Sequence, residues 1–321
     1  MRNLIIAVVC LALAGFLFTA WKIQRDVARG VDGAVMMMSP YAVVQYDGVS
    51  ATLTGELTVD GIRARIKGYT DEFYIDRIGI DTPSFLSLMK LRDMEKLVTS
   101  GDDFLPAYFG IVVEGLRMPV DADYGSEAHS ARLAKLGVQD SLSPAAECTG
   151  KYGLSPSALL AMGYEEYDLS MSALIRHNSD DYDVEITSSS TDMWNLELEL
   201  KLVGNMLTEL AKGTRYRPKM REMRIEYTDE SMNERIVDYC KRRGLSEDEI
   251  HTAMLDSFKF MGEDNGIEFS ENILDPFVEF LGDRDTFILT AKPREPLNLS
   301  QISLYSPKDV PALLLLEAEV R

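Results

Sequence analysis

The sequence predicts an α+β fold: a curved antiparallel β-sheet of short amphipathic strands, helices packed on that sheet, and a single N-terminal transmembrane helix. Three observations support this prediction. An uncharged apolar run occupies residues 4–21, alternating apolar and polar residues recur between residues 49 and 205, and helical patterns with capping residues fill residues 229–281. The chain has 321 residues, 46% of them hydrophobic, which is enough to form a substantial core.

The first predicted element is a membrane anchor over Leu4–Trp21. This run of 18 residues is at the lower limit for a spanning helix, and Trp21 followed by Lys22 is typical of a membrane interface. The alternative is a cleaved signal peptide, because Ala12-Leu13-Ala14 has a small-x-small pattern. Cleavage there would leave Gly15–Trp21 as an apolar tail, so we expect an uncleaved anchor.

The orientation of the anchor follows from two opposing signals. Lys22, Arg25 and Arg29 follow the apolar run and only Arg2 precedes it, which favours a cytoplasmic body. A short N-terminal tail before a long domain is, however, the usual form of a signal anchor. We therefore expect the body to lie outside the cytoplasm.

Strands are predicted next, between residues 49 and 119. Apolar residues alternate from Val49 to Val59, and the phase shifts after Asp60-Gly61, which predicts a strand, a bend or bulge, and a second strand. Further strands are expected at residues 73–80 and 109–113, with a short helix after Pro83. Three strand ends share a glycine, in Val59–Ile62, Val113–Leu116 and Leu202–Asn205, which hints at repetition.

Residues 165–204 predict a three-stranded antiparallel meander with one apolar face. In its last strand Leu196, Leu198, Leu200 and Leu202 alternate with Glu197, Glu199 and Lys201. Such a face either packs against an ordinary core or binds a ligand reversibly.

Helices and returning strands follow, and Ser246 with Glu249 has the pattern of a capping box. We expect an anchor with a helical extension over residues 1–38, a β-rich domain over 39–205, and a helical segment with returning strands over 206–321 packed on the same sheet.

The sequence does not indicate an enzyme. Its three histidines, His129, His177 and His251, have no metal-binding spacing, and no hydrolase or nucleotide-binding motif occurs. We expect no catalytic residue, no metal and no cofactor. The formal net charge of −19 also disfavours a nucleic-acid partner.

Two clusters remain as candidate sites. Cys148 and Cys240 either form a disulfide in an oxidising compartment or remain as two buried thiols. A basic segment in this acidic chain either pairs internally with carboxylates or binds anionic lipid headgroups or an acidic partner; its candidate residues are Arg215, Arg217, Lys219 and Arg221.

The segment GELTVDGIRARI, the following FYIDRIGIDTPSFLSLMKL and the meander, all after a single anchor, resemble AsmA-like and YdgA-like envelope proteins of Gram-negative bacteria. This resemblance is architectural and spans much of residues 1–205. It implies a curved, half-open sheet and a location in the bacterial inner membrane, single-pass, with the body in the periplasm. Left partly open, such a sheet would present the four leucines to acyl chains.

The leading hypothesis is therefore a non-enzymatic, membrane-anchored envelope protein that binds lipid or supports lipid or outer-membrane assembly. The alternative is a scaffold or regulatory subunit of a membrane protein complex. An open apolar trough at the leucines would favour lipid, and a closed core with an exposed apolar patch elsewhere would favour the scaffold.

Overall fold

The structure of the protein is a computed structural model. It describes residues 24–68, 71–92, 106–120, 148, 156–178, 181–204, 219–298, 302 and 304–321.

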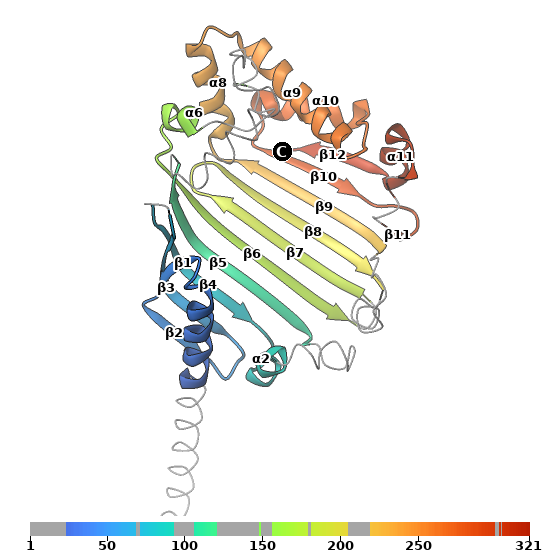
Figure 1. Cartoon of the computed structure of the whole chain (residues 1–321). Helices are drawn as coiled ribbons and strands as arrows, with labels where there is room; N and C mark the ends of the chain where they lie inside the picture. The colour runs from blue at the N-terminus through green and yellow to red at the C-terminus, as the bar shows by residue number, and fades with distance from the viewer. Residues whose placement is uncertain are drawn as a thin grey trace, which may run out of the picture.

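A single large antiparallel β-sheet dominates the structure (Figure 1). Its main strand order is β1-β3-β4-β5-β6-β7-β8-β9-β10-β12, while β2 pairs with β3 and β11 pairs with β9. The strands are β1 (Ala42–Gln45), β2 (Gly48–Ala51), β3 (Leu57–Ile66), β4 (Phe73–Asp81), β5 (Tyr108–Pro119), β6 (Glu166–Asn178), β7 (Asp181–Ser190), β8 (Trp194–Val203), β9 (Lys219–Asp229), β10 (Thr286–Ala291), β11 (Leu297–Asn298) and β12 (Leu316–Val320).

The helices gather around the ends of this sheet (Figure 1). A helix over residues 24–38 lies beside the N-terminal strands, and α2 lies near one end of β4 and β5. In the C-terminal half, α9, α10 and α11 lie beside β10 and β12, whereas α6 and α8 lie at one end of β6–β8. The labelled helices are α2 (Phe85–Arg92), α6 (Pro156–Ala161), α8 (Met232–Arg242), α9 (Glu247–Asp264), α10 (Glu271–Asp283), the 3-10 helix η3 (Pro307–Asp309) and α11 (Val310–Leu314).

The predicted α+β class, with a large open antiparallel sheet and packed helices, is confirmed. The meander is also confirmed, because β6, β7 and β8 are consecutive antiparallel neighbours. The C-terminal strands β9, β10 and β12 extend the same sheet. The capping box at Ser246 is present, with its hydroxyl accepting from the Glu249 N–H.

The predicted anchor over Leu4–Trp21 lies outside the described residues, so it stays a prediction. Among the residues that the structure describes, no helix is long and apolar enough to cross a membrane.

One strand prediction was wrong. The alternation from Val49 to Val59 is not one strand but a hairpin, in which β2 pairs with β3 and Val49 lies opposite Val59. The intervening turn is closed by a backbone hydrogen bond from Gly55 to Thr52. Alternation continues through the turn in the sequence because the two facing strands put their apolar residues on the same side of the sheet.

The phase shift after Asp60-Gly61 is confirmed as an irregularity inside β3. Gly61 has φ +63° and Gly115 in β5 has φ +60°. At Gly115 the strand holds one residue more than β6 between Val113 and Leu116, which is a β-bulge. Both glycines are followed two residues later by an arginine, and each arginine pairs with the aspartate beside the glycine: Arg63 with Asp47, and Arg117 with Asp76.

The bulge at Gly115 and the backbone irregularity at Gly61 keep the apolar residues on one face. Val59 and Ile62 lie opposite Ile78 and Ile75, and Val113 and Leu116 lie opposite the same two isoleucines. Without the extra residue, strict alternation would turn half of each strand toward the wrong side. The third glycine, Gly204, has φ +120° and follows the end of β8 instead of interrupting it.

Substituting Gly61 with alanine should destabilise the protein by about 1–3 kcal/mol, because a Cβ costs energy at positive φ. This Cβ would also lie 2.2 Å from Asp47 Oδ2. Gly48→Ala is the matched control on the neighbouring strand, since its Cβ would meet nothing within 4 Å. Chemical denaturation of both variants measures the difference. Equal stability of the two variants would contradict the assigned role of Gly61.

Candidate functional site

One face of the sheet is apolar from edge to edge. A single register row crosses ten strands, and each of its residues lies opposite the next: Ala51, Leu57, Ile80, Ile111, Ala173, Ile186, Leu198, Ile225, Leu289 and Ala318. The neighbouring row is Val49, Val59, Ile78, Val113, Met171, Ser188, Leu196, Tyr227, Phe287 and Val320. Among the paired positions of the described strands, Asp229 is the one Asp, Glu, Lys or Arg on this face.

The C-terminal part of this face is covered. Met220 and Ala291 are buried in a cluster with Ile273 of α10 and Leu314 of α11, and Leu200 and Leu202 pack against that cluster. Phe287 of β10 is buried with Phe280 and Leu281 of α10, within a group of aromatic rings. These contacts form an ordinary sheet-on-helix core.

Within the described part of the chain, no helix covers the middle of the face. Ile111, Met171 and Ile186, on three adjacent strands, are 41%, 42% and 39% exposed. Around them lies a continuous set of apolar side chains, none of which is buried. We call this set the central apolar face: Ile75, Ile78, Ile80, Phe109, Ile111, Val113, Leu116, Met171, Ala173, Ile175, Val184, Ile186, Leu196 and Leu198.

The central apolar face is large for an exposed apolar surface. It spans five strands, or about 19 Å at roughly 4.8 Å per strand, and about 23 Å along β5 at roughly 3.3 Å per residue. An area on the order of 400 Å² is at the size where an exposed apolar patch marks a binding surface.

The opposite face is charged and polar. Arg77 pairs with Asp60 at 3.0 Å and with Glu114 at 3.4 Å, and Arg176 pairs with Glu185. Ser172 and Thr187 share a hydrogen bond of 2.8 Å between β6 and β7. The two faces therefore differ in kind: one carries charged and polar side chains, and the other carries apolar ones.

The four leucines of the sequence prediction separate into two pairs. Leu200 and Leu202 contact the C-terminal core, whereas Leu196 and Leu198 are half-buried and belong to the central apolar face. The sequence did not identify Ile111, Met171 and Ile186 as the most exposed members. Their alternation was visible, but which strands the helices leave uncovered was not.

The basic candidates are placed only in part. Arg215 and Arg217 lie outside the described residues. Arg221 pairs with Asp181 at 2.8 Å, which favours internal pairing for this residue. Lys219 is exposed at the start of β9.

A second internal network lies close to Arg221 in sequence. Glu222 accepts hydrogen bonds from Lys201 at 2.8 Å and from Lys292 at 2.9 Å, and these contacts lower the pKa of Glu222. Within the described part of the basic segment, Arg221 and Arg224 pair with carboxylates of the same chain, Asp181 and Glu226.

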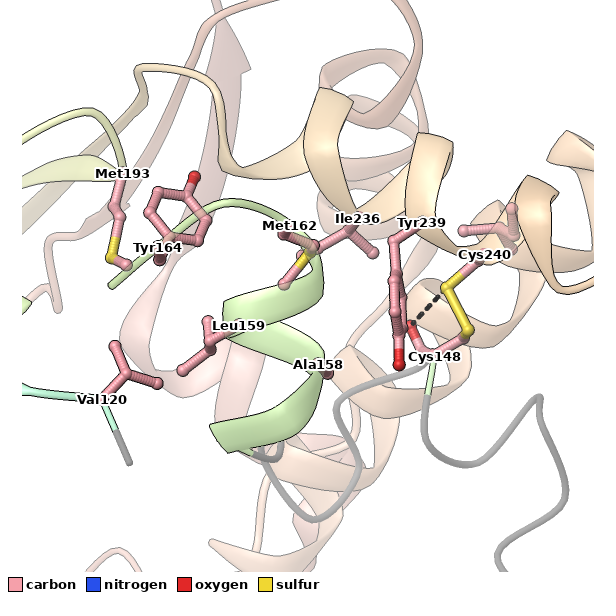
Figure 2. Packing of buried hydrophobic residues seen from close by; sticks show 11 residues of the cluster. Val120, Cys148, Ala158, Leu159, Met162, Tyr164, Met193, Ile236, Tyr239 and Cys240 are labelled. Carbon is pink, nitrogen blue, oxygen red and sulfur yellow. Dashed lines mark hydrogen bonds between the residues drawn. A yellow bond between two sulfur atoms is a disulfide. The ribbon is translucent and has the colours of Figure 1, made fainter. Parts of the chain in front are cut away.

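Cys148 and Cys240 are joined by a disulfide, with Cα atoms 5.8 Å apart (Figure 2). Of the two alternatives from the sequence, the structure has the bridged one. Cys240 lies on α8 and is buried together with Tyr239 and Ile236 of the same helix. The same cluster contains Leu159 of α6, so the bridge lies in the core that holds α6 and α8 together.

That core adjoins one end of the apolar face. Trp194 of β8 packs against it and lies opposite Asp229 of β9. The Asp229 carboxylate accepts from the Asn233 N–H at 3.1 Å, in the first turn of α8. Burial raises the pKa of Asp229 to about 6, an effect that the Asn233 hydrogen bond partly opposes.

The described residues hold no group of His, Cys, Asp and Glu that could bind a metal ion. A protein-family model with the description "Uncharacterized protein" matches residues 187–321. That segment begins within β7 and includes the helices that cover the C-terminal part of the sheet. No curated protein matches the chain.

Removing the disulfide with Cys148→Ser and Cys240→Ser together should cost about 2–5 kcal/mol of stability. The physical reason is the loss of a cross-link between residues separated by 92 positions. Thermal unfolding of the purified chain measures the effect. Thiol labelling of the denatured, unreduced wild type is the control, and labelling of both Cys148 and Cys240 would contradict the bridge.

Asp229→Asn should stabilise the protein increasingly as the pH rises from about 4 to about 7. The raised pKa means that folding favours the protonated acid, so the contribution of Asp229 is fully present below its unfolded pKa near 4 and is lost as the pH passes 6. Asparagine keeps an oxygen for the Asn233 N–H and carries no charge. Melting temperatures of both proteins between pH 4 and pH 8 test this, and a pH-independent difference would contradict it.

Proposed function

We propose that this protein is a non-enzymatic lipid-binding protein of the bacterial envelope, in which the central apolar face contacts acyl chains. The observation that carries the proposal is the absence of any charged side chain from this face together with its exposure at Ile111, Met171 and Ile186. Each methylene that such a surface removes from water is worth about 0.8 kcal/mol, so a single chain is enough for useful affinity.

The residue types favour lipid over a protein partner. Protein–protein interfaces concentrate their binding energy in Trp, Tyr and Arg, none of which is a member of the central apolar face. Of the other residue types enriched at interfaces, the face contains Phe109 and Met171, and its remaining members are aliphatic. Branched aliphatic side chains offer contact area without directional hydrogen bonds. Acyl chains require such a surface because they have no polar group along their length.

The expected location agrees with this proposal. A membrane anchor over Leu4–Trp21, with the body in the periplasm, would hold the sheet next to its source of lipid. The Cys148–Cys240 bridge supports a compartment outside the cytoplasm, since disulfides persist in oxidising surroundings. We propose that the protein supports lipid handling or assembly of the envelope from this position.

Leu200 and Leu202 lie against a closed core, as the scaffold hypothesis expects, whereas Leu196 and Leu198 belong to the open central apolar face, as the lipid hypothesis expects. The two hypotheses differ in what occupies that face. A protein partner seated on the central apolar face would co-purify in a fixed ratio, and no lipid would be bound there. Direct measurement of bound lipid therefore distinguishes the two hypotheses.

Ile186→Asp should leave the protein folded and abolish lipid binding. Ile186 is 39% exposed, so water reaches the new carboxylate, whereas acyl chains cannot contact it without desolvation. Leu200→Asp should instead cost several kcal/mol, because Leu200 packs against the buried C-terminal cluster. Circular dichroism reports the fold, and mass spectrometry of co-purifying lipids reports binding.

Glu199→Ala is the matched control, since Glu199 lies on the exposed opposite face of β8. It should change neither stability nor bound lipid. A folded Ile186→Asp protein that retains the wild-type amount of lipid would refute the assignment of this face. Wild-type protein without any lipid would refute the proposed function itself.

A further inference from the structure

The two edges of the sheet differ in how they are protected against pairing with another strand. Natural edge strands carry charged residues that discourage such pairing. The edge strand β12 follows this rule, with Glu317 and Glu319 exposed along it. The opposite edge strand, β1, has no charged residue, and neither does the whole segment of residues 36–45.

The neighbouring edge strand β2 is shielded by the helix of residues 24–38. The side-chain amide of Gln24 donates to the Val49 carbonyl at 3.3 Å, and the Tyr46 hydroxyl donates to Asp32 of the same helix. A helix over an edge is another common protection. Within the described residues, β1 pairs with β3 alone.

Large apolar side chains cluster beside β1. Met36, Met37 and Tyr41 are 73%, 78% and 76% exposed, and Met38 and Val43 are 50% and 43% exposed. These five residues lie in one short segment, which a turn at Ser39–Tyr41 connects to the strand. A large side chain has about 200 Å² of surface. Scaled by their exposed fractions, the five side chains together offer on the order of 600 Å² of exposed surface per chain.

We propose that β1 is a self-association edge, at which two copies of this chain pair their β1 strands antiparallel about a two-fold axis. An uncharged strand is its own complement, since no like charges meet across the axis. Two copies that bury this segment would remove on the order of 1,200 Å² from water, which clears the roughly 1,000 Å² expected of a specific interface. The inference does not depend on lipid binding.

The proposal also explains why β1 lacks the protections that β2 and β12 have. A second copy would supply backbone partners for its outer edge and cover Met37 and Tyr41. Two chains held in one membrane by the expected anchors would meet at a high effective concentration, with the same edge facing the same direction.

The test is the mass of the full-length chain in detergent, measured by analytical ultracentrifugation and native mass spectrometry. The wild type should be a dimer. Val43→Lys should yield monomers at the same concentration, because each copy would bring a like charge to the otherwise uncharged edge, and its circular dichroism should match that of the wild type. Met37→Glu, on the helix and outside the strand, should weaken the dimer without touching β1 backbone pairing.

Glu317→Lys is the control, since it places a lysine on the other, already charged edge. It should remain dimeric. A wild type that stays monomeric, or an assembly larger than a dimer, would overturn the proposal. So would a dimer that survives both Val43→Lys and Met37→Glu. If Val43→Lys fails to fold, Met37→Glu decides the question alone.

Discussion

Burial of apolar side chains on one face of the sheet is the interaction on which the rest of the structure depends. Each strand must keep its apolar residues on that face over its whole length. A shift of the strand register by one residue would move all of them to the opposite face of the sheet. At Gly115 the chain inserts an extra residue relative to β6, and at Gly61 a positive φ interrupts the alternation without changing the register with β4; at both positions the apolar phase is restored. The positive φ angles there are open to glycine at low cost, so these two residues permit the backbone irregularities that keep the apolar residues of β3 and β5 on one face.

The described helices cover this apolar face only in part. The C-terminal helices α10 and α11 bury the residues of β9, β10 and β12, and α6 with α8 closes one end near Trp194. Asp229, at that end, is half-buried beside the start of α8, and its raised pKa records the cost of placing a carboxylate on this face. Over β4–β8 no described helix buries the apolar side chains, and Ile111, Met171 and Ile186 are exposed. This difference in cover supports the proposed binding surface.

Period-two alternation gave the meander and the apolar side of nearly every strand, because side-chain direction in a strand is a local property. The hairpin at Val49–Val59 was missed, since alternation alone does not reveal a turn. Met220 and Met223 look out of phase in the sequence. An extra residue in β9 between Lys201 and Leu202 of the partner strand places both methionines opposite leucines.

The candidate site required tertiary information. Leu198 and Leu200 have the same pattern in sequence, yet only Leu200 contacts the C-terminal cluster, because α10 and α11 extend over one part of β8. Likewise the pairing of Arg221 with Asp181, and the bridge between Cys148 and Cys240, join residues far apart in the chain. Spacing in sequence does not determine such distances.

Site-specific photo-crosslinking tests the central claim most directly. A photoreactive amino acid at Met171, in the middle of the central apolar face, and another at Glu199, on the opposite face, would be activated in cells and their adducts identified by mass spectrometry. The account predicts lipid adducts at residue 171 and none at residue 199. Protein adducts at residue 171, or lipid adducts at both positions in equal amount, would contradict it.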